Sequence, residues 1–352
     1  MKSELIRLFQ FLYFFKSAIK RRFFMSTRDL KRFVSIDVLL DQRVATVQSS
    51  EPKPKNYSKL KLVKIDRVYI DVKYQHLKSK KNKFIDESTP WPIEYILLSR
   101  STSLYLPSRL YNGVDLNGIK IAMGSSSYYH WLIEQLPNFI RVSDSLADST
   151  TLCWSKSPKY VFDYLKNSDL KYESVNRFLS VDNLVFLPYA KNVGNPTCED
   201  IQILRSNFLE KFGRSKITTD LSKLYISRSS SSRSPQFEKS LEELLISQEW
   251  VVVKPERLSL VEQYNLFRKA KVVMGPHGAG LANTAFMPEQ STVVELRTLI
   301  PGVFHGDEIS QCYKNLSQVL GNNHISLDLS VREYQNREIP PAILTLLGEL
   351  DI

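Results

Sequence analysis

The stretch VVMGPHGAGLANTAFMPEQSTVVEL, residues 272–296, decides the fold. An apolar run enters a segment of small residues at 275–280, which we call the glycine knot, and a small-residue helix is expected to follow. A second apolar run then ends on Glu295. Apolar runs separated by a tight turn and a helix are typical of neighbouring strands in a buried parallel sheet.

Strand and helix patterns alternate along the chain on both sides of the glycine knot. Strands are expected at 68–74, 119–127, 151–155, 183–188, 223–227, 250–254 and 324–329, with helices between most of them. Ser259 and Glu262 form the capping box of one such helix. The alternation predicts an α/β fold whose parallel sheets are covered by helices on both faces.

The composition favours a folded protein and argues against a nucleic-acid groove. Of the 352 residues, 43% are hydrophobic, which is enough for two cores. Residues 1–33 contain nine Lys or Arg and two Asp or Glu, and so hold +7 of the net charge of +11. A charge excess confined to one end does not indicate a basic surface across the fold. Three widely spaced cysteines favour a reducing compartment over secretion.

The N-terminal segment mixes aromatic, apolar and basic residues. Residues 1–25 predict an amphipathic helix, which lies either on an anionic membrane surface or on the protein's own body. Its apolar run is about half the roughly 20 residues that a membrane-spanning helix needs.

The glycine knot is suited to a diphosphate, because ligands of open α/β sheets bind at the carboxyl ends of the strands. Gly278 and Gly280 permit positive φ and close backbone approach. A helix that starts near Ala279 offers backbone amides and the positive end of its dipole. Glu295, expected to end the next strand, is placed to accept hydrogen bonds from a ribose. The alternative is a tight turn with a satisfied His277.

Two arginines favour the ligand-binding interpretation. The segment KLYISRSSSSRS, residues 223–234, ends a strand and carries Arg228 and Arg233 in a serine-rich loop. If this strand neighbours the strand before the knot, both guanidinium groups reach the same crevice, where arginine pairs well with phosphate. The alternative is a solvated, flexible loop.

Four segments in order resemble the glycosyltransferase family 61 group. They are SYYHWLIEQLPNFIRV at 127–142, YISRSSSSR at 225–233, LSLVEQYNLF at 258–267 and the stretch around the glycine knot. The resemblance spans residues 119–321. The group includes bacterial transferases of the capsule and lipopolysaccharide type, plant xylosyl- and arabinosyltransferases, and the eukaryotic transferase that adds O-GlcNAc to EGF repeats.

The resemblance implies a GT-B fold, in which two Rossmann-like, doubly wound domains face a cleft. It also implies inverting transfer from a nucleotide-sugar, commonly UDP-linked, without a metal or another cofactor. We therefore expect a basic amphipathic segment at 1–34, an acceptor-side domain at 35–212, a nucleotide-sugar-binding domain at 213–330 and a C-terminal tail at 331–352.

The expected partners are a nucleotide-sugar donor and a glycan or lipid-linked glycan acceptor, with no nucleic acid. The expected setting is bacterial surface-polysaccharide synthesis in the cytoplasm, with peripheral contact on the inner face of the plasma membrane through residues 1–25. Transfer of either a hexose or a pentose fits the resemblance.

The resemblance also assigns site residues. The segments that bind the donor match Arg228, Arg233, His277, Gly278, Ala279, Gly280, Asn283 and Glu295. His130 and Glu134 match the HW…E segment of the acceptor side. Because they stand four residues apart on one helical face, they are the expected catalytic pair. Either His130 is the base and Glu134 orients it, or Glu134 is itself the base. The alternative is that His130 simply packs beside Trp131.

One departure from the family pattern concerns the arginine loop. The family shows paired arginines and then an asparagine after the first arginine, whereas Arg233, Ser234 and Pro235 follow in this chain.

Two other classes of protein fit parts of the sequence. A dinucleotide-dependent oxidoreductase would share the alternating pattern, but the chain lacks an early GxGxxG, and the knot lacks the Gly-Lys-Ser/Thr of a P-loop. A non-catalytic membrane- or nucleic-acid-binding protein would use the basic N-terminal segment.

Overall fold

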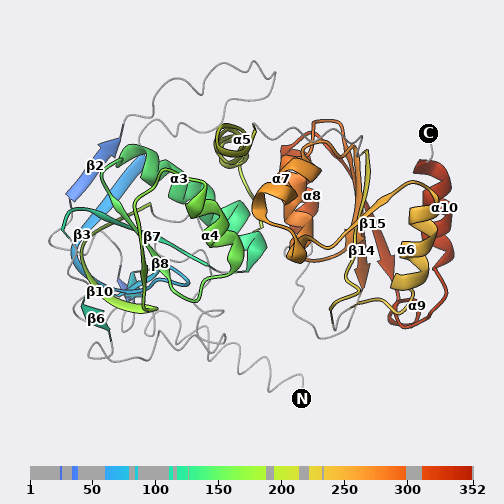
Figure 1. Ribbon diagram of the computed structural model, residues 1–352, viewed down its shortest axis with the longest axis horizontal. Helices are drawn as coiled ribbons and strands as arrows, with labels where there is room; N and C mark the ends of the chain where they lie inside the picture. Colours follow the sequence, from blue (N-terminus) through green and yellow to red (C-terminus); the bar gives the residue numbers. More distant parts are fainter. Residues whose placement is uncertain are drawn as a thin grey trace, which may run out of the picture. The chain divides into compact units, whose positions relative to one another are not determined.

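The computed structural model divides the chain into two compact units (Figure 1). It describes residues 24–25, 34–38, 60–78, 84–85, 111–113, 117–125, 127–187, 194–213, 222–231, 234–298 and 311–350. The second unit comprises Ser127–Pro137, Pro158–Asp169 and Asn192–Ile352, and the first unit comprises the rest. The amphipathic helix predicted at 1–25 lies outside the described residues, apart from the short strand β1 (Phe24–Met25).

The first unit is built on a mixed sheet. Its strands are β1, β2 (Val34–Val38), β3 (Leu60–Asp71), β4 (His76–Lys78), β5 (Phe84–Ile85), β6 (Asn112–Gly113), β7 (Lys120–Met123), β8 (Thr150–Trp154), β9 (Tyr172–Val175) and β10 (Phe178–Phe186). The pairs β10–β7, β7–β8 and β8–β9 are parallel, as predicted, whereas β3 runs antiparallel to β2, β4 and β10. The turn between β3 and β4 is too short for the crossover that a parallel pair requires, so the prediction of parallel pairing was wrong for this part of the sheet.

The second unit holds the parallel sheet that the sequence predicts. Its strands are β11 (Lys223–Ile226), β12 (Val251–Val253), β13 (Val272–Pro276), β14 (Thr292–Thr298) and β15 (Asn323–Leu329). Within the described part of this unit they are arranged in the order β12-β11-β13-β14-β15, and each neighbouring pair is parallel. The neighbourhood of the Arg228 strand and the glycine-knot strand is therefore confirmed.

Helices cover both faces of this sheet (Figure 1). On one side lie α6 (Glu238–Ser247), α9 (Val331–Tyr334) and α10 (Pro341–Leu350); on the other lie α7 (Leu260–Phe267) and α8 (Cys312–Val319). Tyr225, Met274 and Val294 pack with α6 and α10 in one buried cluster. Because strand side chains alternate, Val293 and Glu295 point to the opposite face.

Three helices from earlier in the chain complete the second unit. They are η6 (His130–Gln135), α4 (Lys159–Lys166) and α5 (Cys198–Phe212). The helix α3 (Leu136–Ser145) follows η6 directly, and most of it belongs to the first unit. The rings of Trp131, Tyr164 and Phe208 are buried, and each contacts the next in this order. Phe208 in turn contacts Phe286, with a ring-centroid distance of 4.6 Å. The helix that carries His130 and Glu134 thus belongs to the same compact unit as the glycine knot.

The local signals for α7 are confirmed. Ser259 Oγ accepts a hydrogen bond from the backbone N–H of Glu262, and the Glu262 carboxylate accepts one from the Ser259 backbone N–H at 2.6 Å. In the described part of the chain, helices fall short of the length and apolar character that crossing a bilayer requires.

Candidate functional site

The strand order of the second unit creates a switch point beside the glycine knot. β11 lies between β12 and β13, so the connections from β11 and β12 leave in opposite directions along the sheet. Ligands of such sheets bind outside the carboxyl ends of the strands at this point. β11 ends at Ile226 and β13 at Pro276, and Arg228 and Gly278 each follow two residues later. Both residues therefore lie at the edge where a ligand is expected.

The guanidinium group of Arg228 lies against the bare backbone of Gly278. A Cβ atom added to Gly278 would stand 2.1 Å from Nη2 of Arg228, and one added to Gly280 would stand 3.0 Å from Cγ2 of Ile226. The backbone of Gly278 is extended, with a φ of 162°, and neither glycine has a left-handed φ. The Gly278 backbone thus does admit a close neighbour, the Arg228 side chain, whereas the left-handed φ that the glycines permit is not adopted at either position.

A 3-10 helix, η8 (Ala279–Phe286), follows the glycine knot where the sequence predicts a helix. The carbonyl oxygen of Gly278 accepts hydrogen bonds from the Leu281 backbone N–H at 2.9 Å and from the Tyr313 hydroxyl at 2.7 Å. Ala279 and Gly280 form the first turn and are partly exposed. The start of η8 is thereby anchored to α8 at the switch point.

Glu238 of α6 fixes the loop after β11. Its Oε1 accepts a hydrogen bond from the backbone N–H of Arg228 at 2.6 Å, and its side chain is buried. Burial raises the pKa of Glu238 to about 7; the hydrogen bond from Arg228 opposes this rise, and nearby Glu242 adds to it. Glu242 in turn accepts a hydrogen bond from the hydroxyl of Ser227.

This raised pKa predicts a loss of stability as the pH rises from about 4.5 to about 7. In that window the folded protein retains a proton on Glu238 that the unfolded chain has already released, so folding is penalised by about 3 kcal/mol at the upper end. Glu238→Gln cannot ionise and should flatten this part of the profile. Urea denaturation at several pH values measures the effect, and an unchanged slope in the variant would contradict it.

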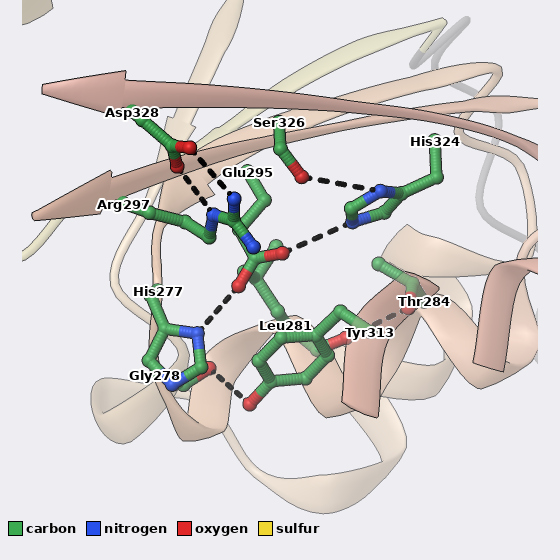
Figure 2. Close-up of polar contacts among 10 residues, drawn as sticks. All are labelled: His277, Gly278, Leu281, Thr284, Glu295, Arg297, Tyr313, His324, Ser326 and Asp328. Carbon is green, nitrogen blue, oxygen red and sulfur yellow. Dashed lines mark hydrogen bonds and ion pairs between the residues drawn. The ribbon is translucent and has the colours of Figure 1, made fainter. Parts of the chain in front are cut away.

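A buried carboxylate links two histidines behind the glycine knot (Figure 2). Glu295 is fully buried; its Oε1 is bonded to His277 Nδ1, and its Oε2 lies 3.0 Å from His324 Nε2. Burial alone would raise the pKa of Glu295, but the hydrogen bonds from the two histidines bring it below its ordinary value.

The expectation that Glu295 ends its strand and contacts a ribose is not met. The residue lies within β14, paired in register with Ser326 of β15. The alternation of the strand turns its side chain into the protein, where it contacts His277 instead of solvent. His277 itself is partly exposed, at 26% of its side chain.

Asn283 is also fully buried, so it supports the site from inside. Its Oδ1 accepts a hydrogen bond from the Tyr128 hydroxyl at 2.6 Å, and its Nδ2 donates to Gln263 Oε1 at 2.8 Å and to the Gly280 carbonyl at 3.2 Å. Asn283 thus ties η8 to the residues that precede His130.

His130 and Glu134 form the pair that the sequence predicts. His130 Nδ1 lies 2.8 Å from Glu134 Oε2, and Glu134 Oε1 accepts a hydrogen bond from the Gly194 backbone N–H at 2.9 Å. The helix that carries the pair is a π-helix, η6, and Pro137 follows it. Proline cannot donate to the carbonyl four residues before it and clashes with it in an α-helix, so a widened turn at this place has a local cause.

Three ring contacts connect His130 with His277. The centroid distances are 5.4 Å for His130–Tyr129, for Tyr129–Tyr313 and for Tyr313–His277. The structure therefore brings the predicted catalytic pair and the glycine knot into one cluster. Sequence reasoning missed Tyr313 and His324, although polar residues alternate with apolar ones in β15 at His324, Ser326 and Asp328.

Arg233 lies outside the described residues, so its predicted position at the knot remains a prediction. Within the part of the chain that the structure describes, groups of three or more His, Cys, Asp or Glu side chains arranged to hold a metal ion are absent.

Comparison with known proteins finds a match for the segment that holds part of this cluster; Glu295, Tyr313 and His324 lie beyond it. Residues 128–294 match the family model of glycosyltransferase 61. The search of curated proteins found no match. The matched segment begins at Tyr128 and includes Arg228, His277 and Gly278. The match supports the resemblance drawn from the sequence: residues 128–294 of this chain are similar to the glycosyltransferase 61 family, a family of glycosyltransferases.

Proposed function

We propose that this protein is an inverting glycosyltransferase that moves a hexose or pentose from a UDP-sugar to a glycan or glycolipid acceptor. The supporting observation is the guanidinium of Arg228, packed on Gly278 at the switch point of the parallel sheet. A diphosphate at this edge would meet Arg228, His277 and the first turn of η8, which together supply positive charge and amide donors.

Inverting transfer needs a base for the acceptor and charge neutralisation for the leaving group. In this proposal, His130 Nε2 takes the proton of the acceptor hydroxyl, and Glu134 holds the ring through Nδ1. The acceptor oxygen bonds to the anomeric carbon, and the bond from that carbon to the diphosphate oxygen breaks. Arg228 then faces the charge that the diphosphate gains.

The wider setting follows from the family resemblance. We infer a GT-B arrangement, with the acceptor bound mainly by residues 35–212 and the nucleotide-sugar mainly by residues 213–330. The proposed role is surface-polysaccharide synthesis on the cytoplasmic side of a bacterial membrane, with residues 1–25 as a peripheral anchor. Deleting residues 1–33 should then release the protein from anionic vesicles and leave UDP-sugar hydrolysis intact.

Calorimetry with UDP tests the donor site. Arg228→Ala should weaken UDP binding by about 10- to 150-fold, because charge-assisted hydrogen bonds contribute about 1.5–3 kcal/mol. The exposed Arg337 provides a control of equal charge, and Arg337→Ala should keep the wild-type affinity. Unchanged UDP affinity in Arg228→Ala would remove this edge as the donor site. A thermal-shift panel of UDP-, GDP-, CMP- and dTDP-sugars, with NADH included, tests the nucleotide and the oxidoreductase alternative.

A further inference from the structure

The cluster of His277, Glu295 and His324, drawn in Figure 2, combines residues from three neighbouring parts of the sheet. His277 directly follows β13, Glu295 lies in β14 and His324 lies in β15. A fully buried carboxylate is costly unless a cation and hydrogen bonds compensate it. Arg297, two residues along the same strand, is bound to Asp328 by two hydrogen bonds of 2.6 and 2.9 Å. Hydrogen bonds from the two histidines compensate the buried carboxylate of Glu295, and a proton on His277 would add a positive charge directly beside it.

We propose that His277 binds the donor diphosphate as an imidazolium, and that Glu295 and His324 are positioning residues that hold it in this state. The inference rests on the proposed function, because it assumes that the diphosphate occupies the edge beside Gly278. It adds a charged hydrogen-bond donor to the site and makes donor binding dependent on a proton.

The orientation of the His277 ring supports this assignment. Its Nδ1 is hydrogen-bonded to Glu295, so its Nε2 lies on the side of the ring away from the carboxylate, and Gly278 directly follows His277 in the chain. The Arg228 guanidinium packs on the same glycine. A phosphate oxygen at this place would therefore receive hydrogen bonds from an imidazolium and a guanidinium.

His324 is buried and contacts the other oxygen of the Glu295 carboxylate, so it supports the carboxylate and does not reach the ligand. Its Nε2 lies 3.0 Å from Glu295 Oε2, and its Nδ1 lies 3.5 Å from the Ser326 hydroxyl. With both carboxylate oxygens hydrogen-bonded, the pKa of Glu295 is lowered and its ionised form is favoured.

The charged and titratable groups around the cluster come from four elements. They are Arg297 on β14, Asp328 on β15, Tyr313 and Cys312 on α8, and Arg228 in the loop after β11. Arg297 and Asp328 neutralise each other, and burial raises the pKa of both Tyr313 and Cys312, which keeps them neutral. Histidine is the residue type whose ordinary pKa lies closest to neutral pH. Diphosphate binding should draw one proton from solvent onto His277 when that residue is neutral beforehand.

The test is UDP affinity measured by calorimetry from about pH 5.5 to about pH 8.5, a range that includes the ordinary histidine titration. Wild-type affinity should fall with rising pH, by up to about tenfold per pH unit once histidine loses its proton. His277→Gln should bind about 10- to 100-fold more weakly at the acidic end and should lack this fall. The ionisation of UDP itself is common to all variants and cancels in the comparison with wild type.

The positioning residues are tested by the same profile. Glu295→Gln should move the fall in affinity to lower pH, and His324→Gln should move it in the same direction by less. A merely structural role would instead lower the affinity equally at every pH. Arg337→Ala, an exposed residue outside the cluster, is the control and should match wild type. Thermal unfolding checks that each variant is folded, and if Glu295→Gln is not, the His277→Gln profile decides.

Two outcomes separate the failure of this inference from that of the proposed function. If Arg228→Ala weakens UDP binding and His277→Gln keeps the wild-type pH profile, the imidazolium assignment is wrong and the donor site stands. If Arg228→Ala leaves UDP affinity unchanged, the donor site itself lies elsewhere and both proposals fall.

Discussion

Glu134→Gln should lower kcat by about 100- to 10,000-fold while the protein stays folded. A glutamine at 134 can still accept the hydrogen bond from the Gly194 backbone N–H through Oε1. Its amide group would then donate to His130 Nδ1, where the carboxylate now accepts. This donation forces the neutral ring into the tautomer with a proton on Nε2, which cannot act as a base.

Steady-state transfer assays with an accepted donor and acceptor measure this effect, together with UDP affinity as a check on the donor site. His130→Ala should lower kcat by a similar factor. The double variant should lower kcat little further, because the two residues act together as one catalytic unit. Asn315→Ala is a suitable control, since Asn315 holds the same segment through the Gly194 carbonyl at 3.3 Å without touching His130 or Glu134 in the described contacts. Full turnover in both single variants would place the base elsewhere.

Gly278→Ala should weaken UDP binding about as much as Arg228→Ala does, by about 10- to 150-fold. The extended backbone at 278 accepts an alanine without strain, so stability should change little. The added methyl group would instead stand 2.1 Å from Arg228 Nη2 and push the flexible end of that side chain out of the site. Gly348→Ala, where a Cβ meets open space, is the matched control.

A double-mutant cycle shows whether Gly278→Ala acts through Arg228. Once Arg228→Ala has removed the guanidinium, the second substitution should have little further effect on UDP affinity. Additive losses would mean that the methyl group obstructs the ligand directly, and displacement of the arginine would then be the wrong explanation.

The second unit could be predicted from the sequence because its signals are local. Apolar runs, the Ser259 capping box and the glycine knot each specify an element within a few residues, and the alternation then implies the parallel sheet. The pairing of His130 with Glu134 followed from helical spacing for the same reason. The glycines were also expected to allow close approach, and Gly278 does so.

Other features depend on which residues meet across strands, and these were missed. Glu295 looked like a strand end, but the register with β15 places it between His277 and His324. Tyr313 comes from α8, a helix that the sequence analysis did not connect with the site. The antiparallel pairs of the first unit also escaped prediction. β4 follows β3 too closely for a helix to separate them, and β10 pairs with β3 from far along the chain.

The series of aromatic contacts that joins η6, α4 and α5 to α7 and η8 limits how the protein can be truncated. A fragment that begins at residue 213 would keep every strand of the second unit but lose Trp131, Tyr164 and Phe208. Tyr264 and Phe286, which now pack against Phe208, would face water. Such a truncated domain should expose apolar surface and aggregate on expression. A fragment that folds on its own should therefore start upstream of residue 128 and include the first-unit segments that lie between the parts of the second unit.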